Sequence, residues 1–81
     1  LSLSRSLRAM QAALTAHGPG MPAAELYAIG RAGLDFDAFD YLNIVDPDTL
    51  QDMDVIDREA RALVGGYVGG TRLIDNMALV P

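Results

Sequence analysis

A pair of glycines, Gly69-Gly70, separates two apolar runs in the last third of this 81-residue chain. Glycines in a two-residue loop supply the positive φ angles that a type I′ or II′ hairpin turn needs. The flanking segments, Leu63–Val68 and Thr71–Ile74, are rich in residues that favour strands. A hairpin alone is only marginally stable in water, so we expect the rest of the chain to cover one face of it and to add a strand.

Apolar residues near the start of the chain recur at steps of four, three and four: Leu3, Leu7, Met10 and Leu14. This spacing predicts a helix from about Ser4 to His17 with one apolar face, ended by Gly18-Pro19-Gly20. A second, short helix is expected from Pro22, which suits a first turn because its missing N–H costs nothing there, to Gly33. Gly30 inside it should weaken the helix by roughly 1 kcal/mol relative to alanine.

The segment Phe39–Val45 reads as a strand bounded by Asp46-Pro47. Its alternation assigns Leu42 and Ile44 to one face and, to the other, Phe39, Tyr41 and Val45. Asp46 is a good N-cap and Pro47 fits the first position of a single helical turn through Leu50. The polar, acidic segment from Gln51 to Glu59 is predicted to be a loop.

Strands over Arg61–Val68 and Thr71–Val80 complete the pattern, with a bulge or bend expected at Asn76. The order is helix, helix, strand, turn, strand, strand. It predicts an α+β fold in which two N-terminal helices pack on one face of a three-stranded antiparallel sheet. Residues 1–81 are expected to form a single small domain with a thin stability margin, since a chain of this size buries only about 60% of its unfolded surface.

Composition excludes several classes of protein. At 51% hydrophobic residues the chain is too apolar to be disordered. It has no apolar run of about 18 residues and no signal peptide, so we expect neither a membrane span nor secretion. The net charge of −5 argues against nucleic-acid or anionic-membrane partners. All six basic residues are arginine and cysteine is absent, which excludes a Walker A lysine, a Schiff-base lysine and thiolate chemistry.

Six acids cluster between positions 46 and 59, namely Asp46, Asp48, Asp52, Asp54, Asp57 and Glu59. A calcium loop of the EF-hand type needs oxygen ligands at positions 1, 3 and 5, glycine at 6 and glutamate at 12. Counted from Asp46, positions 5, 6 and 12 hold Leu50, Gln51 and Asp57, so the sequence does not match such a loop. The run is interpreted as a solvated loop.

The remaining polar candidates have plain alternatives. His17, the only histidine, has no nucleophile positioned beside it and fits a favourable interaction with the helix dipole when protonated. Arg72 could bind a carboxylate or phosphate, or pair with Asp75 or the acidic run as an ordinary salt bridge. Asp75-Asn76 is expected to satisfy backbone groups at a bend. Gly65-Gly66 inside a strand indicates a bulge or a close backbone contact.

Three blocks of the sequence resemble the pantoate–β-alanine ligase family. Gly70-Thr71-Arg72-Leu73-Ile74-Asp75-Asn76, with the strand from Arg61 before it, is similar to the family's closing hairpin. Asp40-Tyr41 through Asp46-Pro47-Asp48-Thr49-Leu50 is similar to its first strand and following turn, and Leu3-Ser4-Arg5-Ser6-Leu7 to the helix after its interdomain hinge. The family usually has bulkier residues at Gly65-Gly66, which predicts a weaker middle strand here.

The resemblance implies that residues 1–81 are the C-terminal lid domain of a larger cytoplasmic ligase, hinged near Leu1. Such enzymes act in pantothenate biosynthesis, on the coenzyme A pathway, and join pantoate and β-alanine through a pantoyl-adenylate, with ATP giving AMP and pyrophosphate. ATP and Mg²⁺ would be bound by the N-terminal domain, whose histidine and serine-arginine-asparagine motifs are not in this sequence. No catalytic, cofactor-binding or metal-binding residue carries over to this chain, and alone it is expected to be inactive.

The implied partners are the chain's own N-terminal domain and, for the parent enzyme, a second copy in a homodimer. A chain that begins at Leu1 rather than Met favours a fragment or a processed product. The alternative is a stand-alone α+β interaction module that pairs through a sheet edge or its open face. An independent hydrolase is disfavoured because no nucleophile–base pair is present.

Overall fold

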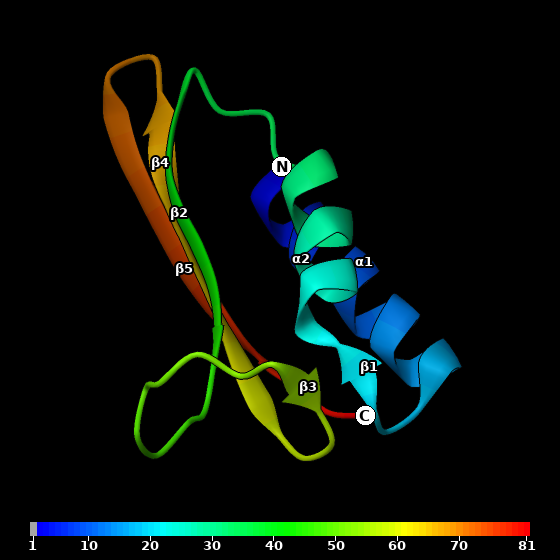
Figure 1. The fold of residues 1–81 in the computed structure, drawn as a ribbon. Helices are drawn as coiled ribbons and strands as arrows, with labels where there is room; N and C mark the ends of the chain where they lie inside the picture. Colours follow the sequence, from blue (N-terminus) through cyan, green and yellow to red (C-terminus); the bar gives the residue numbers. More distant parts are fainter. Residues whose placement is uncertain (1) are drawn as a thin grey trace.

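The computed structural model describes residues 2–81 as two helices and five strands (Figure 1). In chain order these elements are α1 (Ser2–His17), β1 (Met21–Pro22), α2 (Ala23–Ala32), β2 (Ala38–Val45), β3 (Val55–Ile56), β4 (Ala60–Val68) and β5 (Thr71–Leu79). The hinge expected near Leu1 lies outside the described residues.

The larger sheet is antiparallel with strand order β2-β4-β5, and both helices lie on one face of it (Figure 1). The predicted α+β class, the two helices and the three-stranded meander are therefore confirmed. The strand ends agree with the prediction to within one residue, and the first helix begins at Ser2 rather than Ser4. Pro22 stands at the N-cap position of α2, one residue before its first turn.

A second, two-stranded sheet was not expected from the sequence. In it β1 pairs antiparallel with β3, inside the segment predicted to be only a loop. The N–H of Gly20 donates to the carbonyl oxygen of Ile56 at 2.9 Å, and the N–H of Ala23 donates to that of Asp54 at 2.8 Å. Met53 and Ile56 are buried in the core. The loop prediction is therefore wrong for these residues, although the neighbouring acids Asp52, Asp54, Asp57 and Glu59 remain exposed.

The core lies between the helices and the larger sheet. All four residues of the predicted apolar helix face, Leu3, Leu7, Met10 and Leu14, are buried there. The helices approach closely at Gly30, where a Cβ atom would lie 2.4 Å from Met10 Sδ. At the same point the buried hydroxyl of Ser6 donates to the carbonyl oxygen of Gly30 at 2.5 Å. The propensity cost of this glycine is thus offset by a helix–helix contact that a larger residue would prevent.

The hairpin turn and the single turn after β2 form as predicted. Gly69 and Gly70 have φ angles of 57° and 80°, and positive values at both central positions define a type I′ turn. After β2, the N–H of Leu50 donates to the carbonyl oxygen of Asp46 at 2.8 Å, which closes one helical turn. Leu50 then adopts a positive φ of 61° and the chain turns back.

The bulge occurs in a different strand from the one predicted. β4 and β5 stay in register through Asn76, whereas the β2–β4 register shifts between Phe39 and Tyr41. The extra residue, Asp40, turns Phe39 to the side of the helices, where the Arg31 guanidinium lies 4.0 Å from its ring centroid. The prediction that Phe39 and Tyr41 share a face is therefore wrong.

Candidate functional site

The face of the sheet turned away from the helices carries two of the polar candidates, Arg72 and Asn76. Ala62 and Val64 of β4 are buried on the helix side. The residues next to them in β4 therefore point to the other side, together with the β5 residues that pair with those neighbours. We call this surface the open face; it consists of Ala38, Tyr41, Asn43, Val45, Arg61, Leu63, Gly65, Tyr67, Arg72, Ile74, Asn76 and Ala78.

Arg72 on the open face already has a carboxylate partner. Its guanidinium forms a 3.2 Å ion pair with Asp40, the bulge residue of β2, and lies 6.0 Å from the ring centroid of Tyr67. An ordinary salt bridge was one of the two predicted roles, but neither Asp75 nor the acidic run supplies the partner. The sequence did not predict this pair, because 32 positions separate the two residues and only the sheet brings them together.

Asp75 and Asn76 accept hydrogen bonds from the backbone and from a neighbouring strand. The Asp75 carboxylate accepts the N–H of Asn76 at 2.8 Å, as predicted for backbone satisfaction, although the β4–β5 register has no bulge there. The Asn76 side-chain oxygen accepts from the Arg61 guanidinium at 2.5 Å. These contacts position side chains on the sheet and involve no nucleophile.

Gly65 and Gly66 make room for aromatic rings on opposite faces of the sheet. A Cβ atom on Gly65 would meet the Tyr41 ring at 2.5 Å on the open face, and one on Gly66 would meet the Phe36 ring at 2.5 Å on the helix side. Of the two predicted roles, close contact is confirmed. The bulge lies directly across, in β2 rather than in β4.

The acidic run is a set of exposed side chains around one structured aspartate. Asp46 accepts the N–H groups of Asp48 and Thr49 at 2.8 and 3.0 Å, and its second oxygen pairs with Arg58 at 2.8 Å. The hydrogen bonds from the Thr49 and Asp48 amides, helped by the Arg58 charge, hold the pKa of this carboxyl below its ordinary value of 3.8. Within residues 2–81, no group of three or more His, Asp or Glu side chains is arranged to hold a metal ion.

His17 occupies the last turn of α1, where the sequence predicted it. Its Nδ1 lies 3.0 Å from the carbonyl oxygen of Gly18, and the ring is exposed. Its interaction with the helix dipole remains a prediction.

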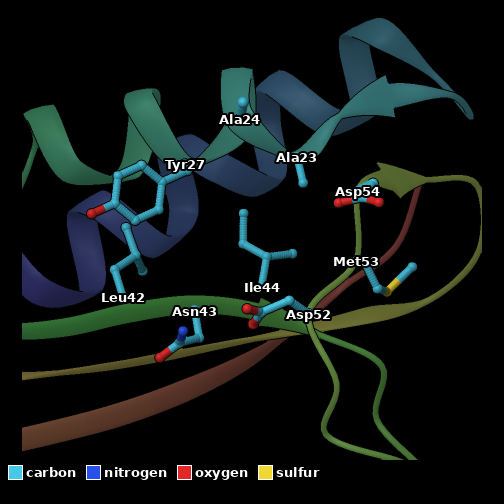
Figure 2. A pocket seen from close by; sticks show the side chains of 9 residues that line it. All are labelled: Ala23, Ala24, Tyr27, Leu42, Asn43, Ile44, Asp52, Met53 and Asp54. Carbon is cyan, nitrogen blue, oxygen red and sulfur yellow. The ribbon is translucent and has the colours of Figure 1, made fainter.

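A pocket of about 380 Å³ lies beside the first turn of α2, between that helix, β2 and the segment before β3 (Figure 2). Its apolar lining is Ala23, Ala24, Leu42, Ile44 and Met53, and its polar lining includes Tyr27, Asp52 and Asp54. The sequence analysis missed this pocket because its walls come from three segments far apart in the chain. Its carboxylates and hydroxyl can accept or donate hydrogen bonds, but no basic side chain lines it.

Comparison with known proteins identifies the family. The family model described as pantoate-beta-alanine ligase matches residues 1–78. The chain belongs to the pantoate–β-alanine ligase family. It is 43% identical to a pantothenate synthetase of Acidobacterium capsulatum and 41% identical to one of Rhizorhabdus wittichii, over 98% and 99% of its length. Its fold matches a crystal structure of the pantothenate synthetase from Thermus thermophilus with a TM-score of 0.81, at 32% identity over 99% of the chain.

This member of the ligase family spans about a quarter to a third of its relatives. It covers 27% and 28% of the two pantothenate synthetases and 29% of the Thermus thermophilus chain. That coverage is consistent with a C-terminal domain fragment of the ligase. Neither helix in residues 2–81 has the length and hydropathy that a membrane span requires.

Proposed function

We propose that this chain is the C-terminal lid domain of an ATP-dependent ligase that joins pantoate and β-alanine. The observation that carries the proposal is the match of the pantoate-beta-alanine ligase model to residues 1–78, in a chain that spans only 27–29% of its relatives. A full enzyme of this kind is expected to act in the cytoplasm as a homodimer.

The proposed reaction has two steps. The carboxylate of pantoate attacks the α-phosphate of ATP, which forms pantoyl-adenylate and releases pyrophosphate. The amine of β-alanine then attacks the acyl carbon, which forms pantothenate and releases AMP. The adenylate is an activated acyl group that water can hydrolyse, so a surface that excludes water protects it between the steps.

The groups that hold ATP and Mg²⁺ belong, in this proposal, to the remainder of the ligase. The chain has no lysine, and its acids form no metal-binding group among residues 2–81. The domain supplies a body that moves as a unit, because one core connects both helices with the larger sheet. A compact domain on a hinge can close over bound intermediates and open to release product.

The experiment compares the full-length protein with the same protein ended just before Leu1. Each is given ATP, pantoate and β-alanine, and AMP and pantothenate are measured separately. For the full-length protein we expect the two products in equal amounts. For the truncated protein we expect AMP to exceed pantothenate, because water then competes with β-alanine for the adenylate.

Two outcomes would contradict the proposal. If the full-length protein forms neither product, it is not the proposed ligase, and an interaction module on the same fold becomes the better explanation. If the truncated protein divides the adenylate between water and β-alanine as the intact protein does, the reaction stands but the lid role does not. A truncated protein that fails to bind ATP is misfolded, so ATP binding is measured alongside.

A further inference from the structure

The outer edge of β2 is only partly covered by the rest of the chain. β2 pairs with β4 on one side, because it is the first strand in the order β2-β4-β5. On its other side the Met53 N–H donates to the Ile44 carbonyl oxygen at 3.0 Å, and the Asp46 N–H donates to the Gln51 carbonyl oxygen at 2.8 Å. The segment 51–53 therefore occupies the next strand position, but only beside the last residues of β2.

Leu42 lies on the part of this edge that stays uncovered. Beyond Met53 the chain turns to α2, where the Ala23 N–H donates to the Asp54 carbonyl oxygen at 2.8 Å. Alternate residues of an antiparallel strand direct their N–H and C=O groups to the same side, so Leu42 directs its groups to the same edge as Ile44. Within residues 2–81, neither backbone group of Leu42 has a hydrogen-bond partner.

The uncovered edge borders the pocket beside α2. Leu42 lines this pocket of about 380 Å³ and is itself only 5% exposed. Nearly all buried backbone groups in proteins have a hydrogen-bond partner, so an unpaired pair of them next to a cavity indicates a place for one. An extended peptide supplies both partners at once, because the residue opposite Leu42 offers one N–H and one C=O.

The pocket is placed to receive the side chain of that residue. Figure 2 shows Leu42 and Ile44 directed from β2 towards α2, and Asn43 directed away from it. Side chains of directly opposed residues lie on the same face of a sheet, so a residue paired with Leu42 directs its side chain towards α2. There the lining is apolar, from Ala23 and Met53 together with the two β2 residues.

The charge at the pocket is negative and unbalanced. Asp52 and Asp54 line it and are exposed, and among the described residues neither forms an ion pair. Arg58 is already paired with two other aspartates. The Tyr27 ring at the same pocket can also attract a cation. The side chain that fits therefore has an apolar stem and a positive head, as lysine and arginine have.

We propose that an extended segment of a partner protein adds as a strand to the free edge of β2, with a lysine or arginine opposite Leu42. Its backbone pairs with Leu42, and its positive head reaches Asp52 and Asp54. The proposal goes beyond the proposed function and does not depend on ligase activity. A second copy of this chain fits less well, because β2 (Ala38–Val45) contains no basic residue and both copies carry a net charge of −5.

The first test measures the binding of three synthetic peptides to the full-length protein by calorimetry. The probe is an acetylated pentapeptide amide with lysine at its centre and valine or threonine elsewhere. One control replaces the lysine by norleucine, and the other carries a methyl group on the lysine backbone nitrogen. We expect binding to weaken severalfold without the charge, and about tenfold without the backbone donor. No binding of the lysine peptide, or equal binding of all three, would overturn the proposal.

Amide hydrogen exchange locates the bound peptide. The Leu42 amide faces the free edge, whereas the Asn43 amide faces β4 and serves as the internal control. We expect the lysine peptide to slow exchange at Leu42 severalfold and to leave Asn43 unchanged. Binding without a response at Leu42 would place the peptide elsewhere and overturn the proposal.

The same experiments distinguish other occupants of the edge. Protection of Leu42 before any peptide is added would mean that a second copy or another part of the protein covers it, and would overturn the proposal; dilution separates these two. Binding of n-butylammonium as tightly as the lysine peptide would make the pocket a small-amine site, with the same consequence for the proposal.

Two double variants test the role of the carboxylates. Asp52→Asn with Asp54→Asn removes two charges at the pocket, and Asp48→Asn with Glu59→Gln removes two from exposed acids outside its lining. We expect the first pair to weaken binding of the lysine peptide severalfold and the second to leave it unchanged. Neither pair should affect the norleucine peptide. Equal losses in both proteins would reduce the effect to net charge and contradict the proposed contact.

Discussion

The two faces of the larger sheet use the same strands for different purposes. Towards the helices, Ala62 and Val64 of β4 and Leu79 of β5 have no solvent exposure. On the other face of the same strands, Leu63 of β4 is half-buried and Ile74 of β5 is largely exposed. The covered face is apolar and close-packed, whereas the open face mixes tyrosine, arginine and asparagine with aliphatic residues.

This difference shows where stability and function are separated in the domain. Side chains on the covered face contribute hydrophobic and packing energy that the isolated domain needs. Side chains on the open face contribute little to folding, so their identities are free to serve a contact with another surface. Substitutions on the two faces should therefore differ in what they disturb, and the following predictions test this.

The largest expected effect is on the covered face of β5. Leu79→Ala removes a fully buried side chain and leaves a cavity, so we expect the free energy of unfolding to fall by about 2–5 kcal/mol. Ile74→Ala on the open face of the same strand is the control, and its expected change is within about 0.5 kcal/mol. Urea denaturation measures both. Equal losses would show that the open face is part of the folding core.

The adjacent glycines of β4 allow the same comparison at neighbouring positions. Gly66→Ala would place a Cβ 2.5 Å from Cδ2 of the Phe36 ring, and we expect a loss of about 1–3 kcal/mol. Gly65→Ala would meet the far end of the Tyr41 ring, which can swing towards solvent, so a smaller loss is expected. Thermal unfolding of the two variants decides the order. A larger loss for Gly65→Ala would mean that Tyr41 is fixed on the open face.

Asp46 provides a pH-dependent contribution away from both faces. Its pKa is lowered in the folded protein by the amides of Thr49 and Asp48, so its stabilising contribution is complete above its ordinary pKa of 3.8. The contribution is lost as the pH falls through the lowered value. Asp46→Asn can still accept hydrogen bonds from these amides. We expect the free energy of unfolding of this variant to depend less on pH below 3.8 than that of the unchanged protein. The same pH dependence for both proteins in urea titrations would contradict this assignment.

The smallest effect is expected for the ion pair on the open face. Asp40 and Arg72 are both exposed, so Asp40→Asn should change the free energy of unfolding by about 0–1 kcal/mol and by less at high salt. A large loss of stability would show that the pair holds the β2 bulge in place.

Much of the fold could be predicted because its signals are local. The spacing of Leu3, Leu7, Met10 and Leu14 predicts α1, and Gly69-Gly70 predicts the hairpin between β4 and β5. Each signal depends on residues that are a few positions apart in the sequence. The ends of the helices, the turn after β2 and the order of the strands in the meander could be predicted from such local signals too.

The candidate site was harder to predict because its contacts join distant positions. The β1–β3 sheet has only two residues on each strand, too few to show the alternation of apolar and polar residues that predicts a strand. It forms where the chain after α1 meets the chain before β4. The Arg72–Asp40 pair and the pocket beside α2 likewise join residues from separate elements. The proposed function rests on the family assignment, and no single side chain here would have revealed it.

Backbone preference and hydrophobic spacing act over a few residues, so they were enough to define the helices, the type I′ turn and the apolar residues available for a core. The bulge at Asp40, the side on which Phe39 lies, the partner of Arg72 and the face of the sheet that stays open depend on how the elements pack. Each of these depends on which strand lies beside which and on what packs above it, and the free energy of such contacts exists only once the chain has folded.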